Sequence, residues 1–365
     1  MLIELTTASP PYKVTQRKAS EELKRRMQGD AAVARLIGMT EKFSGIDSRF
    51  IVIPDGNYNN EKNFFTTNEG NHYNPDTQAR MQMYEKWSAK LAEDAVEELF
   101  TKTKIDHNRI NRLITISCTG FYAPGLDYHL IQKFNLPKSI KRTNIGFMGC
   151  SAALNGVNSV WEALNSNKEK NITTLLVAVE ICSIHLQTQA TRDNILVNMI
   201  FADGASAVLF SNETENGLKP QLKISFAETV LFDNSAEFMG WKIGNYGFEM
   251  LLSSEIPKII LESATPEIKK ILNKNGFDVG SIKFWALHPG GRAILDSLQK
   301  GLGLNDEQML PSREVLRNYG NMSSVSILFI LKKILQDNII HKGEYCCAIA
   351  FGPGLTMELV MFEGV

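Results

Sequence analysis

The 365-residue chain is 44% hydrophobic and 22% charged, and its 39 Lys and Arg against 40 Asp and Glu leave a net charge of -1. These values predict a globular protein of one large or two fused modules, and they exclude nucleic-acid binding that depends on an excess of basic residues. The five irregularly spaced cysteines do not suit a disulfide framework, no secretory signal is recognisable, and charges or Gly-Pro steps break both long apolar runs, so we expect a cytoplasmic protein without a membrane span.

Helices and short apolar strands alternate along the chain. Residues 83–99 have an apolar side chain at every fourth position, which predicts an amphipathic helix. The β-rich run RLITISCTG follows at 112–120, a second helix is predicted to begin near Cys150, and the apolar run TTLLVAVEI at 173–181 predicts another strand. This order predicts an α/β fold with parallel strand pairs.

These elements recur in the second part of the chain. The strand that begins at Arg112 aligns with IKFWALHPG, which begins at Ile282, and the strand in NITTLLVAVE, which begins at Asn171, aligns with GEYCCAIAFG, which begins at Gly343. The helices that begin after Cys150 and Asn321 are separated by almost the same interval. Sequence identity between the two parts is negligible. The alternative explanation of the recurrence is therefore the regular alternation of helices and strands that any α/β protein shows.

The repetition predicts two pseudo-duplicated α/β halves, residues 1–212 and 213–365, with the polar linker SNETENGLKP between them. Cys150 and Asn321 would then occupy equivalent helix N-termini that face each other across a pseudo-twofold axis. His288 would lie at the C-terminal end of a strand, where open α/β sheets bind their ligands.

Cys150 is the candidate nucleophile. Its small neighbours in GFMGCSAALNG allow a tight strand-to-helix turn and the close approach of a substrate. A helix N-terminus lowers the pKa of a thiol, so we expect thiolate character. A small buried apolar residue is the other role of a lone cysteine, and it is our interpretation of Cys182, Cys346 and Cys347.

His288 and Asn321 also occupy distinctive settings. LHPGGRAI places His288 at a strand end before a Pro-Gly turn, and Asn321 in NYGNMSS precedes a helix that is apolar on nearly all sides. A structural turn histidine and a helix N-cap are the alternative roles of these residues. The other five histidines have no such pattern and are interpreted as surface or hydrogen-bonded core residues.

The Gly-rich loops do not suit a phosphate. FGPG stands between two strand-like runs, HPGGR has no phosphate-binding pattern, and no GxxxxGK[ST] motif occurs. No HExxH or paired-histidine pattern supplies metal ligands. We therefore expect no metal, dinucleotide or ATP.

Four segments together resemble the chalcone synthase-like, or type III, polyketide synthases, in particular those of the bacterial type. These segments are GFMGCSAALNG, LHPGGRAILD, NYGNMSS and AFGPGLTMELV, in this order and spacing. The resemblance covers nearly the whole chain. It implies the thiolase fold, with two duplicated halves in a layered αβαβα arrangement, and a homodimer that needs no metal or organic cofactor.

By this resemblance, Cys150, His288 and Asn321 are the catalytic residues. An acyl-CoA starter would be loaded on Cys150 and extended with malonyl-CoA, while His288 and Asn321 hold the developing enolate oxygen. The resemblance also implies a set of substrate-binding residues around them: Cys118, Leu186, Ala293, Ser323, Gly352 and Gly354.

The chain departs from the plant enzymes at several of these positions. By local match, Leu186 replaces the gatekeeper phenylalanine between the coenzyme A tunnel and the cavity, Cys118 replaces an active-site threonine, and Ala123 replaces a methionine that crosses between subunits. We therefore expect a wider route that favours medium or long fatty acyl-CoA starters and alkylpyrone or alkylresorcinol products. The alternative is that neighbouring side chains refill the space, so that only small starters or malonyl-CoA are used.

The residues that bind the coenzyme A phosphates are poorly defined. Asp47 takes a place that a lysine usually holds, which leaves Lys42 and Arg49 as weak candidates.

Three other functions fit part of the pattern. A β-ketoacyl carrier-protein synthase III also uses Cys, His and Asn, but its glycine loop is normally FGGG rather than FGPG. A papain-like protease has the same three residue types in the same order, but carries a Cys-Gly-[Ser/Ala]-Cys signature near the mature N-terminus. A scaffold without activity is disfavoured because all three catalytic residue types are present.

Overall fold

The computed structural model describes residues 1–27, 31–53, 64–66, 72–166, 171–213 and 219–365. Part of the predicted linker, residues 214–218, lies outside the described residues.

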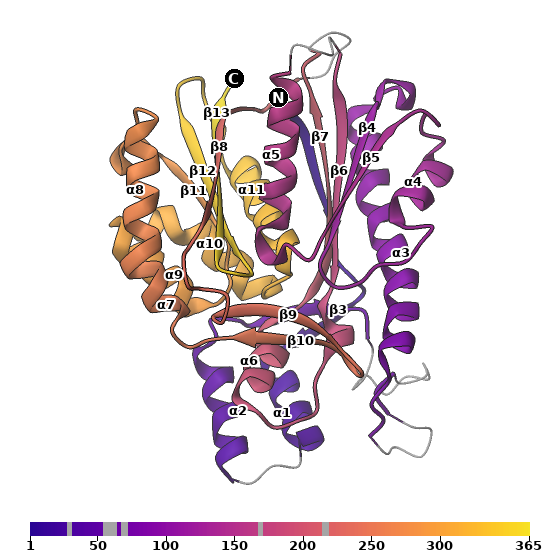
Figure 1. The fold of residues 1–365 in the computed structure, drawn as a ribbon, viewed down its shortest axis with the longest axis vertical. Coiled ribbons are helices and arrows are strands. Elements are labelled where there is room, and N and C mark those ends of the chain that lie inside the picture. The colour runs from indigo at the N-terminus through magenta and orange to yellow at the C-terminus, as the bar shows by residue number, and fades with distance from the viewer. Residues whose placement is uncertain (28–30, 54–63, 67–71, 167–170, 214–218) are drawn as a thin grey trace.

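The framework is a mixed sheet to which nine strands of the described residues belong (Figure 1). These strands are β1 (Leu2–Ala8), β4 (Arg112–Ser117), β5 (Lys141–Gly146), β6 (Thr173–Ile181), β7 (Asp203–Ser211), β8 (Leu222–Leu231), β11 (Phe284–Leu287), β12 (Tyr345–Gly352) and β13 (Thr356–Gly364). Their order across the sheet is β11-β12-β13-β8-β1-β7-β6-β4-β5. Two smaller pairs are β2 (Tyr12–Thr15) with β3 (Ser48–Ile51), and β9 (Met239–Gly244) with β10 (Gly247–Leu252).

The sheet repeats one arrangement of strands. β4 is parallel to β6, and β6, β7 and β1 form successive antiparallel pairs. β11 is likewise parallel to β12, and β12, β13 and β8 form successive antiparallel pairs. The predicted duplication is therefore present in the topology, and the two copies meet where Leu2 pairs with Leu222. The boundary at residues 212 and 213 falls between β7 and β8 and stays a prediction.

Helices lie between the two copies and on their outer faces. α5 (Ala152–Leu164) packs on β4 of the first copy and on β8 and β13 of the second, and α11 (Ser326–Asp337) packs on β1 and β12. α3 (Thr77–Thr103) covers the outer face of the first copy, and α10 (Asp306–Tyr319) packs on β11 (Figure 1). The layers therefore alternate in the predicted αβαβα order. The remaining α-helices of the described residues are α1 (Gln16–Met27), α2 (Ala31–Phe43), α4 (Leu126–Phe134), α6 (Arg192–Ile200), α7 (Ile256–Ile259), α8 (Thr265–Lys274) and α9 (Arg292–Leu302).

Burial explains the apolar patterns of these elements. All nine residues of β6 are buried, because helices cover both faces of the sheet at this strand. The helix predicted at 83–99 lies within α3. Its apolar side chains recur every fourth residue because they face the core, where Leu91, Ala95 and Leu99 are buried. The central helix α11 is buried along most of its length. No helix in the described part of the chain has both the length and the apolar composition that a bilayer span requires.

Candidate active site

Cys150 lies in a short 3₁₀ turn, Gly149–Ser151, between β5 and the α-helix that begins at Ala152. Gly149 has a φ of 61°, and a Cβ at this position would lie 2.3 Å from Cδ of Pro353. Only glycine therefore allows the FGPG loop of the second half to pack against the cysteine turn. The loop therefore has a packing role beside the turn that carries the thiol.

His288 comes directly after β11, and its backbone N–H donates to the carbonyl of Ile349 at 2.9 Å. The side chain is 2% exposed, and neither ring nitrogen has a hydrogen-bond partner among the described residues. An imidazole with two free nitrogens in a buried site is rare, because burying an unpaired polar group costs free energy. Both nitrogens are therefore available to a substrate, and no hydrogen bond in the described residues selects a tautomer.

Asn321 lies between the other two residues. Its Nδ2 is 3.5 Å from the carbonyl of Gly290, in the turn after His288, and its Oδ1 accepts the backbone N–H of Ser323 at 2.9 Å. The side chains of Asn321 and Ser323 both lie close enough to the thiol of Cys150 to lower its pKa. The structure thus gathers the three predicted catalytic residues and Ser323 at the interface of the two halves.

The two helix starts are not fully equivalent. Cys150 is the middle residue of its 3₁₀ turn, whereas Asn321 lies before the corresponding turn, Ser323–Val325, and outside it. The interval between the two turns is therefore slightly longer than the predicted interval between Cys150 and Asn321. The residue of the second half that matches the position of Cys150 in its turn is a serine, Ser324.

Burial changes the acid–base properties of the site. It raises the pKa of the Cys150 thiol to about 12, although hydrogen bonds from Ser323 and Asn321 act in the opposite direction. Burial also lowers the pKa of His288 to about 3. Burial thus acts against the thiolate character that the helix start predicts for Cys150, and it disfavours the charged form of the His288 ring as well. The charge state of the pair stays a prediction.

Glu180 at the end of β6 is a buried carboxylate that the sequence interpretation missed. Its Oε2 accepts hydrogen bonds from the backbone N–H of Cys118 at 3.0 Å and the hydroxyl of Thr119 at 2.8 Å. Burial raises its pKa, while these hydrogen bonds lower it. A single charged residue in the otherwise apolar run TTLLVAVEI was the available signal in the sequence.

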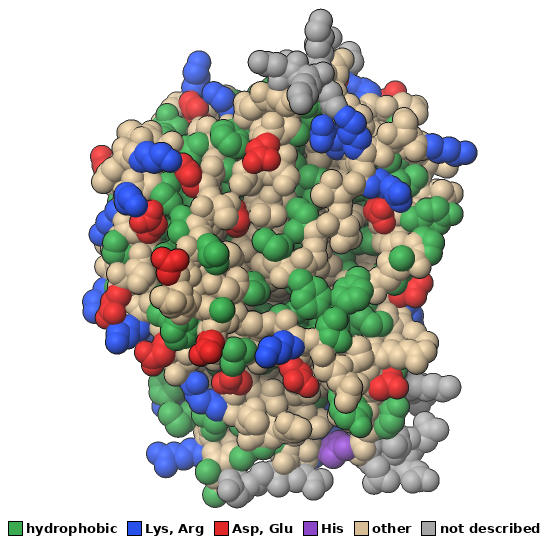
Figure 2. Space-filling model, viewed as in Figure 1, with side chains coloured by type: hydrophobic (Ala, Val, Ile, Leu, Met, Phe, Trp, Pro, Cys, Tyr) green, Lys and Arg blue, Asp and Glu red, His purple; other side chains and the backbone are tan. Residues whose placement is uncertain are grey.

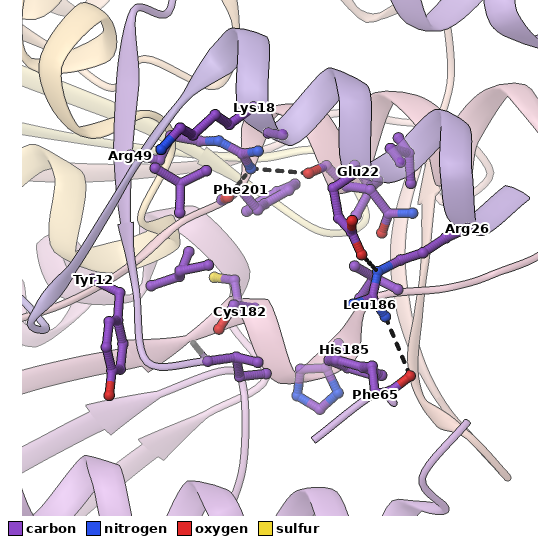
Figure 3. Close-up of a pocket in the computed structure, with 18 of the residues that line it drawn as sticks. Tyr12, Lys18, Glu22, Arg26, Arg49, Phe65, Cys182, His185, Leu186 and Phe201 are labelled. Carbon is purple, nitrogen blue, oxygen red and sulfur yellow. Dashed lines mark hydrogen bonds and ion pairs between the residues drawn. The ribbon is translucent and has the colours of Figure 1, made fainter. Parts of the chain in front are cut away.

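Two cavities adjoin at the site. The smaller, about 30 Å³, is lined by Cys118, Cys150, Ser323 and Pro353 among others. The larger, about 530 Å³, lies among α1, β3 and the segment after β6 (Figure 3). Three residues line both cavities: Cys182, Phe201 and Trp241.

The lining residues bear on two expectations. Leu186 lines the larger cavity and not the smaller one, so its predicted position between the coenzyme A tunnel and the cavity stays a prediction. The aromatic side chains that line both cavities are Phe201 and Trp241. Cys182 also lines both cavities, and is thus more than the buried apolar residue that we expected.

The remaining predicted binding residues lie outside both cavities. Ala293 is exposed near the start of α9, Gly352 packs against the hydroxyl of Ser151, and the Gly354 carbonyl accepts a hydrogen bond from Ser235 at 2.5 Å. Their roles stay predictions.

Arg49 is not available to a phosphate, because its side chain is buried and donates to two backbone carbonyls. Lys42 lies over the ring of Phe43 and lines neither cavity. Among the described residues, no group of three or more His, Cys, Asp or Glu side chains is placed to hold a metal ion. The expectation that the protein needs no cofactor stays a prediction.

A duplicated αβαβα fold with a buried cysteine at the interface of its halves is the architecture of the thiolase-fold condensing enzymes. Two family models match, "Chalcone and stilbene synthases, C-terminal domain" over residues 221–365 and "FAE1/Type III polyketide synthase-like protein" over residues 66–236. The chain belongs to the family of chalcone synthase-like, or type III, polyketide synthases, which are acyltransferase-type enzymes. This result excludes the papain-like protease interpretation.

Known proteins agree with this assignment. An "Alpha-pyrone synthesis polyketide synthase-like Pks18" of Mycobacterium tuberculosis is 29% identical over 287 residues, which are 78% of this chain and 72% of that protein. A putative chalcone synthase of Bacillus subtilis is 27% identical and covers 99% of this chain and 98% of its own. The crystal structure of PKS-I from the brown alga Ectocarpus siliculosus has a TM-score of 0.91 at 27% identity, and covers 100% of this chain and 98% of that one.

Proposed function

We propose that this enzyme loads an acyl-CoA starter on Cys150, extends it by repeated decarboxylative condensation with malonyl-CoA, and releases an alkylpyrone, an alkylresorcinol or a related aromatic polyketide. The observation that carries the proposal is the grouping of the Cys150 thiol and the Asn321 carboxamide with an imidazole, His288, whose nitrogens are unpartnered among the described residues. We also propose that the enzyme is cytoplasmic and uses no metal or organic cofactor.

Loading begins with proton transfer from the neutral thiol of Cys150 to the neutral imidazole of His288. The sulfur attacks the thioester carbonyl, the bond to the coenzyme A sulfur breaks, and the leaving thiolate takes the proton back from His288. Because the proton moves within a buried pair, no net charge enters the site. The acyl group is then held as a thioester on Cys150.

Extension requires an oxyanion site. The carbon–carbon bond to the malonyl carboxylate breaks, carbon dioxide leaves, and the electron pair forms an enolate whose oxygen accepts hydrogen bonds from Asn321 Nδ2 and one ring N–H of His288. The enolate carbon attacks the acyl carbonyl, and the bond to the Cys150 sulfur breaks. The released thiolate takes up a proton, and the lengthened product remains on coenzyme A for reloading.

The larger cavity supports an aliphatic starter. Its lining includes the apolar residues Leu23, Ile51, Ile53, Phe65 and Leu186. Charged residues line it as well: Lys13, Lys18, Glu21, Glu22, Arg25, Arg26 and Arg49. Each methylene that a chain buries there contributes about 0.8 kcal/mol, before the loss of chain freedom is subtracted. The relative from Mycobacterium tuberculosis, described as an alpha-pyrone synthesis enzyme, is consistent with this product class.

A panel of starters tests the proposal. Hexanoyl-, lauroyl-, palmitoyl- and 4-coumaroyl-CoA are each supplied with radiolabelled malonyl-CoA, and every product is identified by mass spectrometry. We expect kcat/KM to be highest for lauroyl- or palmitoyl-CoA. A preference for 4-coumaroyl-CoA, or products from malonyl-CoA alone, would contradict the aliphatic starter. Elongation that requires an acyl carrier protein would favour the β-ketoacyl synthase III alternative.

We further propose that the enzyme is a homodimer. β5 is the last strand of the sheet and most of its residues are exposed. The nearby Phe121 is 53% exposed and packs on Phe147, and hydrophobic side chains gather near the middle of the face in Figure 2. An exposed edge strand beside aromatic surface favours pairing with a second copy. Light scattering at micromolar concentration should give twice the mass of 40.8 kDa.

A further inference from the structure

Arg49 occupies a place in the fold that its sequence neighbourhood does not suggest. It follows a loop that is bonded to the end of α10, because the backbone N–H of Asp47 donates to the carbonyl of Arg317 at 2.8 Å and the Ser48 hydroxyl donates to the carbonyl of Asn318 at 3.2 Å. Arg49 is only 6% exposed in spite of its charge. A buried arginine requires partners that repay its lost hydration.

The partners of Arg49 are two backbone carbonyls. Nη1 donates to the carbonyl of Asn198 at 2.9 Å and to that of Phe201 at 2.5 Å. Figure 3 shows Arg49 and Phe201 together at one side of the larger cavity. Phe201 is one of the residues that line both cavities, so Arg49 holds the backbone of an aromatic residue at the junction.

The other edge of the same backbone segment binds Asn321. The N–H of Asn321 donates to the carbonyl of Ile200 at 2.9 Å, and the N–H of Ala202 donates to the carbonyl of Asn321 at 2.8 Å. Phe201 and Asn321 thus form a parallel β-bridge. The Phe201 carbonyl points to the opposite edge, toward Arg49. Arg49 and Asn321 therefore bracket residues 200–202 from two sides.

Direct packing strengthens this arrangement. Gly320, the residue before Asn321, has a φ of 70°, and a Cβ there would lie 2.8 Å from Cγ and Cδ of Arg49 and 2.9 Å from the carbonyl oxygen of Ile200. The arginine stem and the backbone of residue 320 are therefore in contact without room for a methyl group. A shift of the Arg49 side chain would move the backbone that carries the Asn321 carboxamide.

We propose that Arg49 is a positioning residue, which holds Phe201 at the cavity junction and, through the bridged backbone, holds the Asn321 carboxamide in the geometry that the enolate requires. This inference rests on the proposed function of Asn321 in the decarboxylation of malonyl-CoA. Lysine cannot replace arginine here, since a guanidinium group presents several N–H donors in a rigid plane and an ammonium group does not.

Arg80 provides a matched control. It is a second buried arginine that donates to backbone carbonyls, from Nη1 to Ile184 at 2.6 Å and to Leu186 at 3.0 Å. These carbonyls belong to the segment after β6 and not to the segment that pairs with Asn321. Arg49→Lys and Arg80→Lys should therefore lower Tm to a similar extent, but only Arg49→Lys should act on the oxyanion site.

The experiment compares two partial reactions in the parent enzyme and both variants. Intact-mass spectrometry follows the acylation of Cys150 by lauroyl-CoA, and acetyl-CoA release follows the decarboxylation of malonyl-CoA. We expect Arg49→Lys to keep the acylation rate within about threefold of the parent, while kcat for decarboxylation falls on the order of tenfold to a hundredfold, the range expected for a displaced catalytic group. Arg80→Lys should keep decarboxylation within about twofold.

Three results would overturn the proposal: parental decarboxylation in Arg49→Lys, an equal fall of both reactions in that variant, or an equal effect in Arg80→Lys. If Arg49→Lys does not fold, Arg49→Ala is assayed with and without millimolar methylguanidinium, which can reach a side chain that lines the larger cavity. Saturable recovery of decarboxylation supports the proposal, and its absence overturns it. Failure of the parent to decarboxylate malonyl-CoA would instead refute the proposed function.

Discussion

The hydroxyl of Ser324 donates a hydrogen bond of 2.5 Å to Oε1 of Glu180, and both residues are fully buried. This contact joins the start of α11 in the second half to the end of β6 in the first. The other carboxylate oxygen accepts bonds from the loop of Cys118 and Thr119. Glu180 therefore connects three segments around the catalytic cysteine.

Replacing Glu180 should be strongly destabilising. Glu180→Ala removes the acceptor for the Ser324 hydroxyl, the Cys118 N–H and the Thr119 hydroxyl, and buried donors without partners cost about 1–3 kcal/mol each. We expect the free energy of unfolding, measured with urea, to fall by roughly 3 kcal/mol or more. Glu180→Gln, which keeps a carbonyl acceptor, should reduce it less. The exposed Glu262→Ala is the control, and an equal effect there would contradict this function of Glu180.

Cys150 should be the sole acyl carrier. Cys150→Ala should abolish both acylation by the starter and product formation, because Cys150 lies at the start of α5 beside Ser323 and Asn321, which lower the pKa of its thiol. Intact-mass spectrometry after incubation with acyl-CoA measures this directly. Cys182→Ala, which alters another thiol of the same cavity, is the control and should still be acylated. A stable adduct on Cys118 or Cys182 in Cys150→Ala would falsify the assignment.

Substitutions of Asn321 and His288 should affect different steps of the reaction. Asn321→Ala should still accept the starter but lose on the order of a hundredfold to a thousandfold in malonyl-CoA decarboxylation, since it removes one oxyanion donor. His288→Ala should impair both steps, because the imidazole takes the thiol proton and also holds the enolate. Single-turnover acylation and acetyl-CoA release measure the two steps. Decarboxylation at the parental rate in Asn321→Ala would require its enolate role to be abandoned.

Leu186→Phe should shorten the preferred starter. The larger side chain occupies space in the 530 Å³ cavity, and the loss of two buried methylenes corresponds to roughly tenfold in kcat/KM for palmitoyl-CoA. The value for hexanoyl-CoA should change little. Leu231→Phe, at a position that is 66% exposed, serves as the control. An unchanged chain-length profile in Leu186→Phe would show that this side chain does not limit the starter.

Acid should destabilise the fold through His185. Its Nε2 donates to the carbonyl of Thr119 at 2.7 Å, its Nδ1 accepts the N–H of Phe248 at 2.9 Å, and burial lowers its pKa to about 3. Because the unfolded chain binds a proton below about pH 6.5 and the folded chain does not, stability is lost as the pH falls from 6.5 toward 3, by about 1.4 kcal/mol per pH unit. Asp203 acts in the opposite direction between about pH 6 and 4, since burial raises its pKa to about 6.

Urea unfolding at pH 7 and pH 5 isolates the contribution of His185. His185→Gln is less stable than the parent at pH 7, but it should lose less stability on acidification, because glutamine does not titrate. His341→Gln, at an exposed position, should keep the parental pH dependence. Equal acid sensitivity in His185→Gln and the parent would show that folding does not lower the pKa of His185.

The sequence alone was sufficient for the type of fold. The alternation of helix and strand patterns, and the recurrence of three elements at an almost constant offset, predicted the duplicated topology that β4-β6-β7-β1 and β11-β12-β13-β8 display. The four motifs around Cys150, His288 and Asn321 identified the family. These features depend on local periodicity and on residue types at short spacing, so they can be read along the chain.

Contacts between distant segments decided the remaining features. The sequence did not indicate that Phe201 and Trp241 line both cavities, because the cavities adjoin where the segment after β6 meets α6 and the β9–β10 hairpin. Arg49 was a weak candidate for binding phosphate, but it lies buried against the carbonyl of Phe201.

The pKa of the catalytic thiol also depends on contacts between distant segments. Its position near a helix start predicted a lowered pKa, whereas complete burial between the two halves raises it. The helix dipole is a local property that the sequence specifies, and hydration is lost only when segments far apart in the chain close over the sulfur. The sequence by itself therefore determined the fold type, the family and the three candidate catalytic residues. The tertiary structure decided which residues line the cavities, which partners the buried charged groups have, and how far burial shifts the pKa values of the site.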